Sequence, residues 1–287
     1  MTAEMAPMIE PYGALAPGPF DAAVIAMTSR LPVNWLGLRL AIGLRRMVTM
    51  RLPADGGVDV ERWGLRVRLH PRHNGCEKGL LFTPQFYEAR ERAELGARIA
   101  RAKGTGRPFV FVDIGANVGL FSLFVASRAG ADARILAVEP ERENLRRLRF
   151  NIDANPGLPI RVLPHALGEA EGPLALEIHC GDRGGTRTRP LQDSGVTAAG
   201  IQVQCKTLAQ VLAQQNVQWI DALKIDVEGA EDSILVPFFK AVPESLWPRF
   251  LIVEDTHELW RVDLFSELRA RRYKVSARTK LNVMMDR

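Results

Sequence analysis

The chain has 287 residues, of which 47% are hydrophobic and 25% are charged, a composition typical of a soluble globular protein. A net charge of +5 is too small by itself to indicate a nucleic-acid partner. The three cysteines form no CxxC pair, so no zinc site is predicted and a reducing compartment is favoured. No apolar run reaches the roughly 18 residues of a membrane span, and Glu4 and Glu10 stand where a secretory signal would be basic. We therefore expect a cytoplasmic protein.

Residues 1–57 are expected to form an N-terminal arm followed by one basic helix. Four prolines within residues 1–20 predict a loosely ordered arm. Between Asp21 and Asp55 there is no acidic residue, but there are five arginines, at positions 30, 39, 45, 46 and 51. A helical stripe is formed by Trp35, Leu36, Leu40, Leu44 and Met47. We favour docking of this stripe on the protein itself, and weak peripheral contact of residues 30–52 with an anionic membrane is the alternative.

Residues 58–287 are expected to form one α/β domain. A short hairpin around Trp63-Gly64 and a charged helix over residues 86–103 precede the core. The core alternates predicted strands at 109–112, 135–138, 160–165, 222–225 and 250–254 with predicted helices near 121–129, 143–154, 207–215 and 231–238. This alternation predicts a doubly wound sheet, and segments 273–276 and 281–285 predict a C-terminal antiparallel hairpin. The Gly-, Ser- and Thr-rich residues 181–200 predict a mobile surface loop that covers a substrate.

A glycine-rich turn follows the first core strand. The apolar run 109–112 ends at Asp113, and the turn Gly115-Ala116-Asn117-Val118-Gly119 leads into an apolar helical segment. Glycines in such a turn let the backbone approach a nucleotide closely. Glu139 ends the next strand 20 residues after Gly119, the offset at which an acidic residue binds ribose hydroxyls. The segment therefore predicts a cofactor that contains adenosine.

Two features of this turn distinguish between such cofactors. A dinucleotide site needs glycine at the third and sixth places of the turn, where this chain has Asn117 and Leu120. Asp113, beside the turn, would repel a pyrophosphate but would attract a ligand ammonium. A cofactor with a ribose and a cationic amino-acid tail fits both features. We therefore predict S-adenosyl-L-methionine rather than NAD or FAD.

Four segments carry a resemblance to a known family: 111–119 (FVDIGANVG), 138–140 (VEP), 165–168 (HALG) and 223–231 (LKIDVEGAE). In these segments the chain resembles the FkbM family of S-adenosylmethionine-dependent methyltransferases. The resemblance implies a class I, Rossmann-like methyltransferase fold, in which the C-terminal hairpin completes a seven-stranded sheet. It also implies O-methylation of a hydroxyl on a sugar, glycan or natural product. The resemblance implies that His165 and Ala166 lie at the edge of the adenine. From the residues alone, His165 could equally be a structural histidine that forms hydrogen bonds at the end of a strand.

Cofactor-binding residues are expected where the predicted strands end, because ligands of open α/β sheets bind at the carboxyl edge. The strand ends carry four carboxylates, Asp113, Glu139, Asp226 and Glu254. We expect Asp113 and the amides of Gly115 and Gly119 to hold the methionine portion of the cofactor. We expect Glu139 to bind the ribose through two charge-assisted hydrogen bonds. The predicted cofactor set is completed by Asn117 and Asp226.

Methyl transfer to a hydroxyl also needs a group that removes the proton. The candidates for this base are Asp226, Glu228, Glu254 and His257. Lys224 shares a strand face with Asp226 and is expected to act in the site, paired with the carboxylate of Asp226 or Asp113. A divalent ion shared by Asp226 and Glu254 is an alternative means of acidifying the hydroxyl, whereas the leading hypothesis contains no metal.

The leading hypothesis is an S-adenosylmethionine-dependent O-methyltransferase with a small-molecule or glycan acceptor. A nucleic-acid amino-methyltransferase is disfavoured, because the strand that ends at Asp226 lacks the turn of Asn or Asp followed by Pro-Pro-aromatic that those enzymes share. A third hypothesis is a scaffold that binds the cofactor but does not catalyse methyl transfer. The presence of Asp113, Glu139 and Asp226 disfavours it, and only a turnover assay excludes it. The sequence gives no oligomeric state.

Overall fold

The computed structural model describes residues 10–53, 55–72, 74–177, 187–190 and 201–287. The chain divides into two compact units, residues 1–87 and 88–287. The boundary that the sequence suggests after residue 57 falls inside the first unit, which therefore also contains the predicted hairpin.

The first unit joins three helices and a hairpin. These elements are α1 (Pro19–Thr28), α2 (Trp35–Thr49), β1 (Val58–Arg62), β2 (Leu65–Leu69) and α3 (Gly75–Phe82). β1 and β2 pair antiparallel, and Trp63 and Gly64 between them have φ values of 55° and 79°. Two residues with positive φ form the turn that suits the twist of a two-stranded hairpin. The predicted hairpin is confirmed.

The arm before α1 is attached to this hairpin. Asp59 on β1 accepts hydrogen bonds from the amides of Gly13 and Leu15 at 2.7 and 3.1 Å. Asp59 also forms a buried ion pair with Arg68 on β2, which fixes its orientation. The prediction of a loosely ordered arm is therefore wrong for its described part, and residues 1–9 lie outside the described residues.

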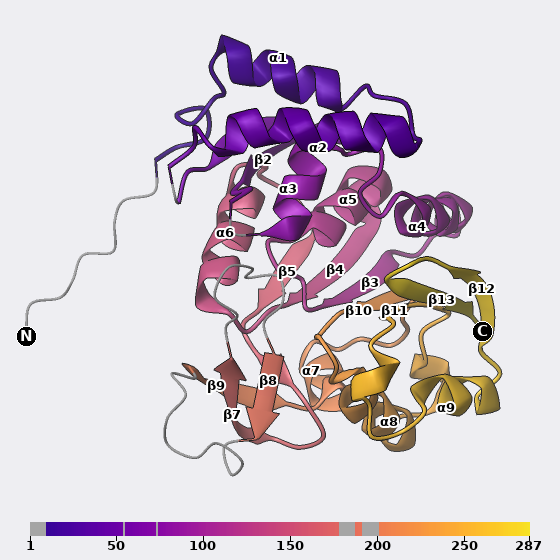
Figure 1. The fold of residues 1–287 in the computed structure, drawn as a ribbon. Coiled ribbons are helices and arrows are strands. Elements are labelled where there is room, and N and C mark those ends of the chain that lie inside the picture. The colour runs from indigo at the N-terminus through magenta and orange to yellow at the C-terminus, as the bar shows by residue number, and fades with distance from the viewer. Residues whose placement is uncertain (1–9, 54, 73, 178–186, 191–200) are drawn as a thin grey trace, which may run out of the picture. The chain divides into compact units, whose positions relative to one another are not determined.

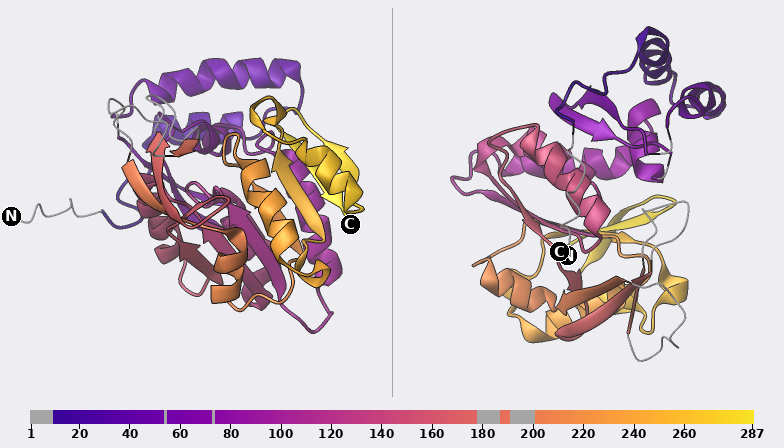
Figure 2. Two further views of the ribbon diagram at one scale, coloured as in Figure 1. Left: turned by 90° about the horizontal axis from the view of Figure 1, so that it is seen from below. Right: turned by 90° about the vertical axis from the view of Figure 1, so that its left-hand side faces the viewer.

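α2 confirms the predicted basic helix but presents its faces differently. α1 and α2 pack side by side, as the nearly end-on view in the right panel of Figure 2 shows. α2 buries Gly37, Ala41 and Val48, and a Cβ on Gly37 would lie only 2.1 Å from the carbonyl oxygen of Pro32. The stripe residues that are 49–67% exposed are Trp35, Leu36, Leu40 and Met47. Within the first unit, α2 therefore docks through its small residues and not through the stripe.

The second unit is built on a seven-stranded sheet with the order β12-β13-β11-β10-β3-β4-β5. Its strands are β3 (Phe109–Ile114), β4 (Ala133–Val138), β5 (Ile160–Leu163), β10 (Ala222–Ile225), β11 (Phe250–Glu254), β12 (Lys274–Arg278) and β13 (Asn282–Asp286). All neighbours are parallel except β13, which is antiparallel to β11 and β12. The Rossmann-like, class I methyltransferase fold and its C-terminal hairpin are thus confirmed. The strand order reverses between β3 and β10, and ligands of such sheets bind at this switch point.

Helices cover both faces of this sheet (Figure 1). One face carries α4 (Ala89–Ala102), α5 (Leu120–Ala129) and α6 (Arg142–Asp153), and the other carries α7 (Leu208–Gln214), α8 (Glu231–Ala241) and α9 (Leu264–Ala270). Every side chain of β3 is buried, because this central strand is covered on both sides. α9 was not predicted from the sequence. Among the described residues, no helix has the length and apolar character needed to cross a membrane.

A smaller, four-stranded sheet lies between β5 and α7 in the sequence, in the order β6-β9-β7-β8. Its strands are β6 (Ala166–Leu167), β7 (Gly172–Glu177), β8 (Arg187–Pro190) and β9 (Ile201–Lys206). β8 falls within the predicted loop 181–200, so that prediction is wrong at these four residues. The remainder of 181–200 lies outside the described residues. β8 has no large apolar side chain, which explains why the sequence gave no strand signal there.

Candidate functional site

The glycine-rich turn after β3 is a tight backbone structure at the switch point. Gly115 has a φ of +73°, and a Cβ there would lie 1.8 Å from the carbonyl oxygen of Asp226. The amide of Gly115 donates to the carbonyl of Val138 at 3.0 Å, and the amide of Gly119 donates to Ala116 at 2.8 Å. The two amides that we expected to hold the methionine portion are therefore engaged within the protein.

Asp113, the last polar residue of β3, is directed into the first turn of α5. Its side chain accepts from the amide and the hydroxyl of Ser122 at 3.1 and 2.7 Å, and only 1% of the residue is exposed. Gly119, at the start of α5, has no side chain that could cap the helix, so Asp113 satisfies one of its unpaired amides. Burial raises the pKa of Asp113, although Lys224 opposes this effect. The structure thus shows Asp113 holding the start of α5, and its expected contact with the methionine portion stays a prediction.

Glu139 follows β4 and lies against the same turn. It accepts from the amides of Asn117 and Glu141 at 2.8 and 2.9 Å, one on each oxygen. Burial raises the pKa of Glu139 to about 7, and only 5% of the residue is exposed. A carboxylate offers about four acceptor sites, so Glu139 can accept from a ribose hydroxyl in addition to these groups. The structure therefore brings Glu139 and Asn117 together, as a cofactor site needs.

His165 and Ala166 connect the main sheet to the smaller one. His165 follows β5 and is partly buried, and its Nδ1 has no hydrogen-bond partner among the described residues. Burial, and then the charge of Lys206, lower the pKa of His165, so a neutral ring is favoured. Ala166 is buried and pairs with Cys205 of β9. These two residues lie one strand beyond Glu139, where an adenine edge is expected in this fold.

Three carboxylates meet where β10 and β11 end. Asp226, Glu228 and Glu254 each place an oxygen within 4.8 Å of the other two. The amide of Glu228 donates to Oε2 of Glu254 at 3.2 Å. Burial, and then the charges of Asp226 and Glu228, raise the pKa of Glu254 to about 9. This raised pKa favours the protonated form of Glu254 while no cation is bound nearby. We call these three residues the carboxylate cluster.

Lys224 compensates part of this negative charge. Its Nζ lies 2.7 Å from the carboxylate of Asp226, which confirms the predicted pairing. Only 5% of the lysine side chain is exposed, and its Nζ stands 4.9 Å from the centre of the Phe121 ring. Burial lowers the pKa of Lys224, but Asp226, Glu88 and Asp113 outweigh it and raise the pKa overall. Lys224 is therefore charged and fixes the orientation of Asp226.

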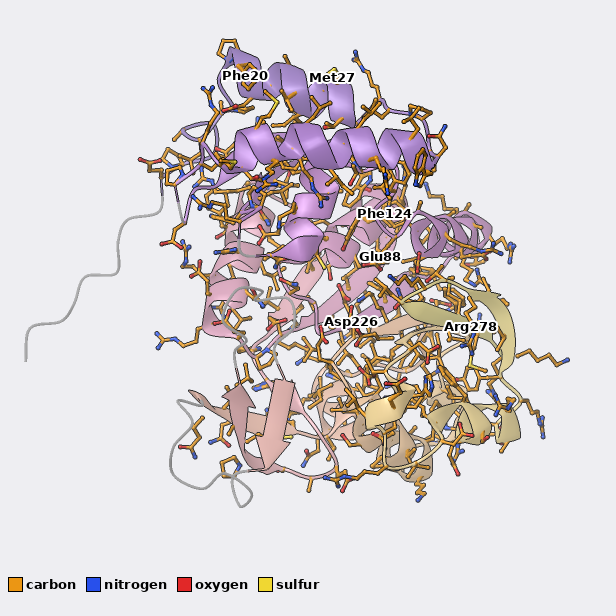
Figure 3. All side chains as sticks on the ribbon, viewed as in Figure 1. Phe20, Met27, Glu88, Phe124, Asp226 and Arg278 are labelled. Carbon is orange, nitrogen blue, oxygen red and sulfur yellow. The ribbon has the colours of Figure 1, made fainter. Side chains whose placement is uncertain are left out.

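His257 is separate from the carboxylate cluster. Its ring is 61% exposed, and Nδ1 lies 2.7 Å from Asp255. Asp255 also accepts from Arg278 at 2.7 Å, so the histidine belongs to a surface ion-pair group. Figure 3 labels Asp226 and Arg278 at the two sites. Of the four candidates for the base, the structure brings three together and leaves His257 outside.

Glu231 is the last residue of the motif 223–231, and the sequence alone assigned it no function. It begins α8 and is fully buried. One oxygen accepts from the amides of Val227 and Gly229 at 3.0 and 3.3 Å. The other accepts from the Thr256 hydroxyl and the Trp260 indole N–H, both at 2.7 Å. Glu231 therefore ties the loop after β10 to the loop after β11, which are the loops beside the carboxylate cluster.

One family model and two curated proteins match this chain. Residues 113–274 match the model of the methyltransferase FkbM domain. The methyltransferase sdnD of Sordaria araneosa is 32% identical over 176 residues, which cover 51% of this chain and 66% of that protein. The AMB antimetabolite synthetase AmbE of Pseudomonas aeruginosa is 30% identical over 205 residues, which cover 59% of this chain and 10% of that protein. The chain thus spans less than two thirds of the length of either curated relative. Among solved structures, the METTL16 MTase domain superposes with a TM-score of 0.49 at 14% identity, covering 94% of this chain and 91% of that one.

Proposed function

The chain belongs to the FkbM methyltransferase family, and we propose that it transfers the methyl group of S-adenosylmethionine to a hydroxyl of a sugar, glycan or natural product. The observation that carries this proposal is the carboxylate cluster at the ends of β10 and β11, with one raised pKa and one buried lysine. An acidic site suits a cationic cofactor, and a carboxyl of raised pKa suits proton removal from a hydroxyl. The name of AmbE as an antimetabolite synthetase favours a small-molecule acceptor over a nucleic acid.

Several residues of this chain fit the cofactor. Glu139 would accept from the ribose hydroxyls, Asn117 would line the turn beside them, and His165 with Ala166 would border the adenine. The amides of Gly115 and Gly119 do not contribute, because they bond within the turn. When bound, S-adenosylmethionine would supply an electrophilic methyl group, and its positive charge would lower the pKa of Glu254 towards neutrality.

The chain's own part in the reaction is to orient the acceptor and to remove its proton. Asp226, fixed by Lys224, orients the acceptor by accepting a hydrogen bond from a polar group beside the reacting hydroxyl. Glu254 receives the proton at Oε1, the oxygen that does not accept from Glu228. General-base catalysis contributes a factor of roughly 10² to 10⁴ to such reactions.

The test is methyl transfer from labelled S-adenosylmethionine to a panel of hydroxyl acceptors by the wild type, Asp226→Asn, Glu254→Gln and the exposed control Asp263→Asn. Both cluster variants should lose about a hundredfold or more in turnover, while their affinity for S-adenosylhomocysteine changes only a few-fold. Full activity in Asp226→Asn would refute its role in orientation. Cofactor binding without transfer to any hydroxyl by the wild type would favour the scaffold reading instead.

A further inference from the structure

The first unit exposes an apolar surface that methyl transfer does not use. In the described chain, ten of the fourteen exposed large apolar side chains lie between residues 20 and 50. We call their main part the α1–α2 surface, which comprises Phe20 and Met27 on α1 and Trp35, Leu36, Leu40 and Met47 on α2. Figure 3 labels Phe20 and Met27, which are seven residues apart and so share one side of α1. Apolar clusters of this kind mark surfaces that bind a partner.

The residues of α2 separate into three faces. At about 100° per residue, Leu36, Leu40 and Met47 lie within about 40° of one another around the helix axis. The buried Gly37, Ala41 and Val48 lie about a quarter of a turn to one side of them. Arg39 and Arg46 lie about a quarter of a turn to the other side. The outward part of α2 is therefore an apolar stripe with cations along one edge, and the exposed Ile42 and Leu38 lie beyond those cations. Helices that lie in a membrane interface combine apolar and cationic residues in this way.

The charge around this surface is mainly positive, although Asp21 in the first turn of α1 pairs with Arg51 at 3.7 Å. The five arginines between Asp21 and Asp55 have no acidic neighbour in that stretch of sequence. The Arg39 guanidinium lies 4.8 Å from the centre of the Trp35 ring, and that of Arg51 lies 5.0 Å from the Phe20 ring. Long arginine side chains of this kind can bury their stems beside apolar groups while the charged ends reach phosphate oxygens. The surface is thus complementary to a partner that has negatively charged groups at its surface and an apolar interior.

We propose that the α1–α2 surface binds an anionic phospholipid bilayer, with its apolar stripe at the boundary of headgroups and acyl chains. A second copy of the chain is a poorer occupant, because the arginines of two such surfaces would face one another. The proposal goes beyond the proposed methyl transfer, because it rests only on residues of the first unit.

Flotation of the full chain with vesicles tests this proposal. Vesicles of phosphatidylcholine alone are compared with vesicles of equal parts phosphatidylcholine and phosphatidylglycerol. We expect binding to the mixed vesicles, weakened by salt. Arg39→Gln with Arg46→Gln should lower the partition coefficient about 25-fold, since each arginine near an anionic surface contributes about fivefold. Leu36→Gln with Met47→Gln should lower it about tenfold or more.

Two matched pairs in the second unit serve as controls. Val275→Gln with Leu281→Gln removes side chains that are 49% and 57% exposed. Arg101→Gln with Lys240→Gln removes two exposed charges. Both controls should bind as the wild type does, and circular dichroism should show all variants folded.

Three results would overturn the proposal. The wild type would fail to float with mixed vesicles at low salt, or the control pairs would lose as much binding as the test pairs. Alternatively, the wild type would be a dimer that Leu36→Gln with Met47→Gln converts to a monomer without any vesicle binding. That last outcome would identify the surface as an interface between copies.

Discussion

Glu231→Gln is expected to weaken the connection between the two loops beside the carboxylate cluster. The wild-type carboxylate accepts two amides from the loop after β10, and it accepts the Thr256 hydroxyl and the Trp260 N–H from the loop after β11. A glutamine can keep its oxygen towards Val227 and Gly229. Its amide nitrogen would then face the indole N–H of Trp260, where two donors oppose each other.

The size of this effect follows from the buried position of Glu231. A hydrogen bond to a charged group contributes about 1.5–3 kcal/mol, and a buried donor without a partner costs about 1–3 kcal/mol. We therefore expect Glu231→Gln to lower the free energy of unfolding by about 2–4 kcal/mol. Trp260→Phe should destabilise the wild type by about 1–2 kcal/mol, but should be neutral or stabilising beside Glu231→Gln, because it removes the opposing donor.

Urea unfolding of the wild type, both single variants and the double variant measures this coupling. We expect a coupling energy of about 1–3 kcal/mol between the two positions. Trp247→Phe provides the control, because Trp247 packs on Phe239 of α8 and has no bond to Glu231. Its effect should add to that of Glu231→Gln within about 0.5 kcal/mol. If Trp260→Phe cost the same in both backgrounds, the assigned role of Glu231 would be refuted.

The pH dependence of stability should reveal the raised pKa of Glu254, about 9 in the folded state against 4.5 as the ordinary value. The folded state binds this proton more tightly, so its contribution to stability is present below about pH 4.5 and is lost as pH rises to about 9. Glu254→Gln should therefore gain stability relative to the wild type over that range, by at most about 1.4 kcal/mol per pH unit, in urea unfolding. A difference that does not change with pH would contradict the raised pKa. Gly115→Ala should destabilise the protein by about 2 kcal/mol more than Gly106→Ala, because both glycines have a φ of +73° but only a Cβ at Gly115 would meet the Asp226 carbonyl. Equal shifts in the thermal unfolding of the two variants would show that this close contact can relax.

The central strands of the main sheet could be predicted because apolar residues dominate them. β10 and β11 begin and end at the predicted residues, since apolar residues dominate both strands and Lys224 is the one charged residue within β10. The smaller sheet could not be predicted, because its two-residue β6 and the polar β8 give no periodic signal. The orientation of α2 was missed for another reason. Its small residues allow close helix packing, which outweighs burial of the larger apolar stripe.

The strand-end rule also located most of the candidate site. It brought Asp226 and Glu254 to one edge, since parallel strands end on the same side of the sheet. It could not show where each side chain turns, because that depends on partners distant in sequence or on the local helix start. Asp113 turns to Ser122, and His257 turns to Asp255. The binding roles of Glu139, His165 and the carboxylate cluster stay predictions until ligands are measured.

Calorimetric titration of the purified protein with S-adenosylhomocysteine, alongside NAD, tests the central claim most directly. We predict micromolar binding of S-adenosylhomocysteine, no binding of NAD, and a clear loss of affinity in Glu139→Gln. Because the pKa of Glu139 is about 7, the affinity of the wild type should also rise about tenfold between pH 6 and pH 8, and this rise should vanish in the variant. Binding of NAD in place of S-adenosylhomocysteine, or unchanged affinity in Glu139→Gln, would contradict the account.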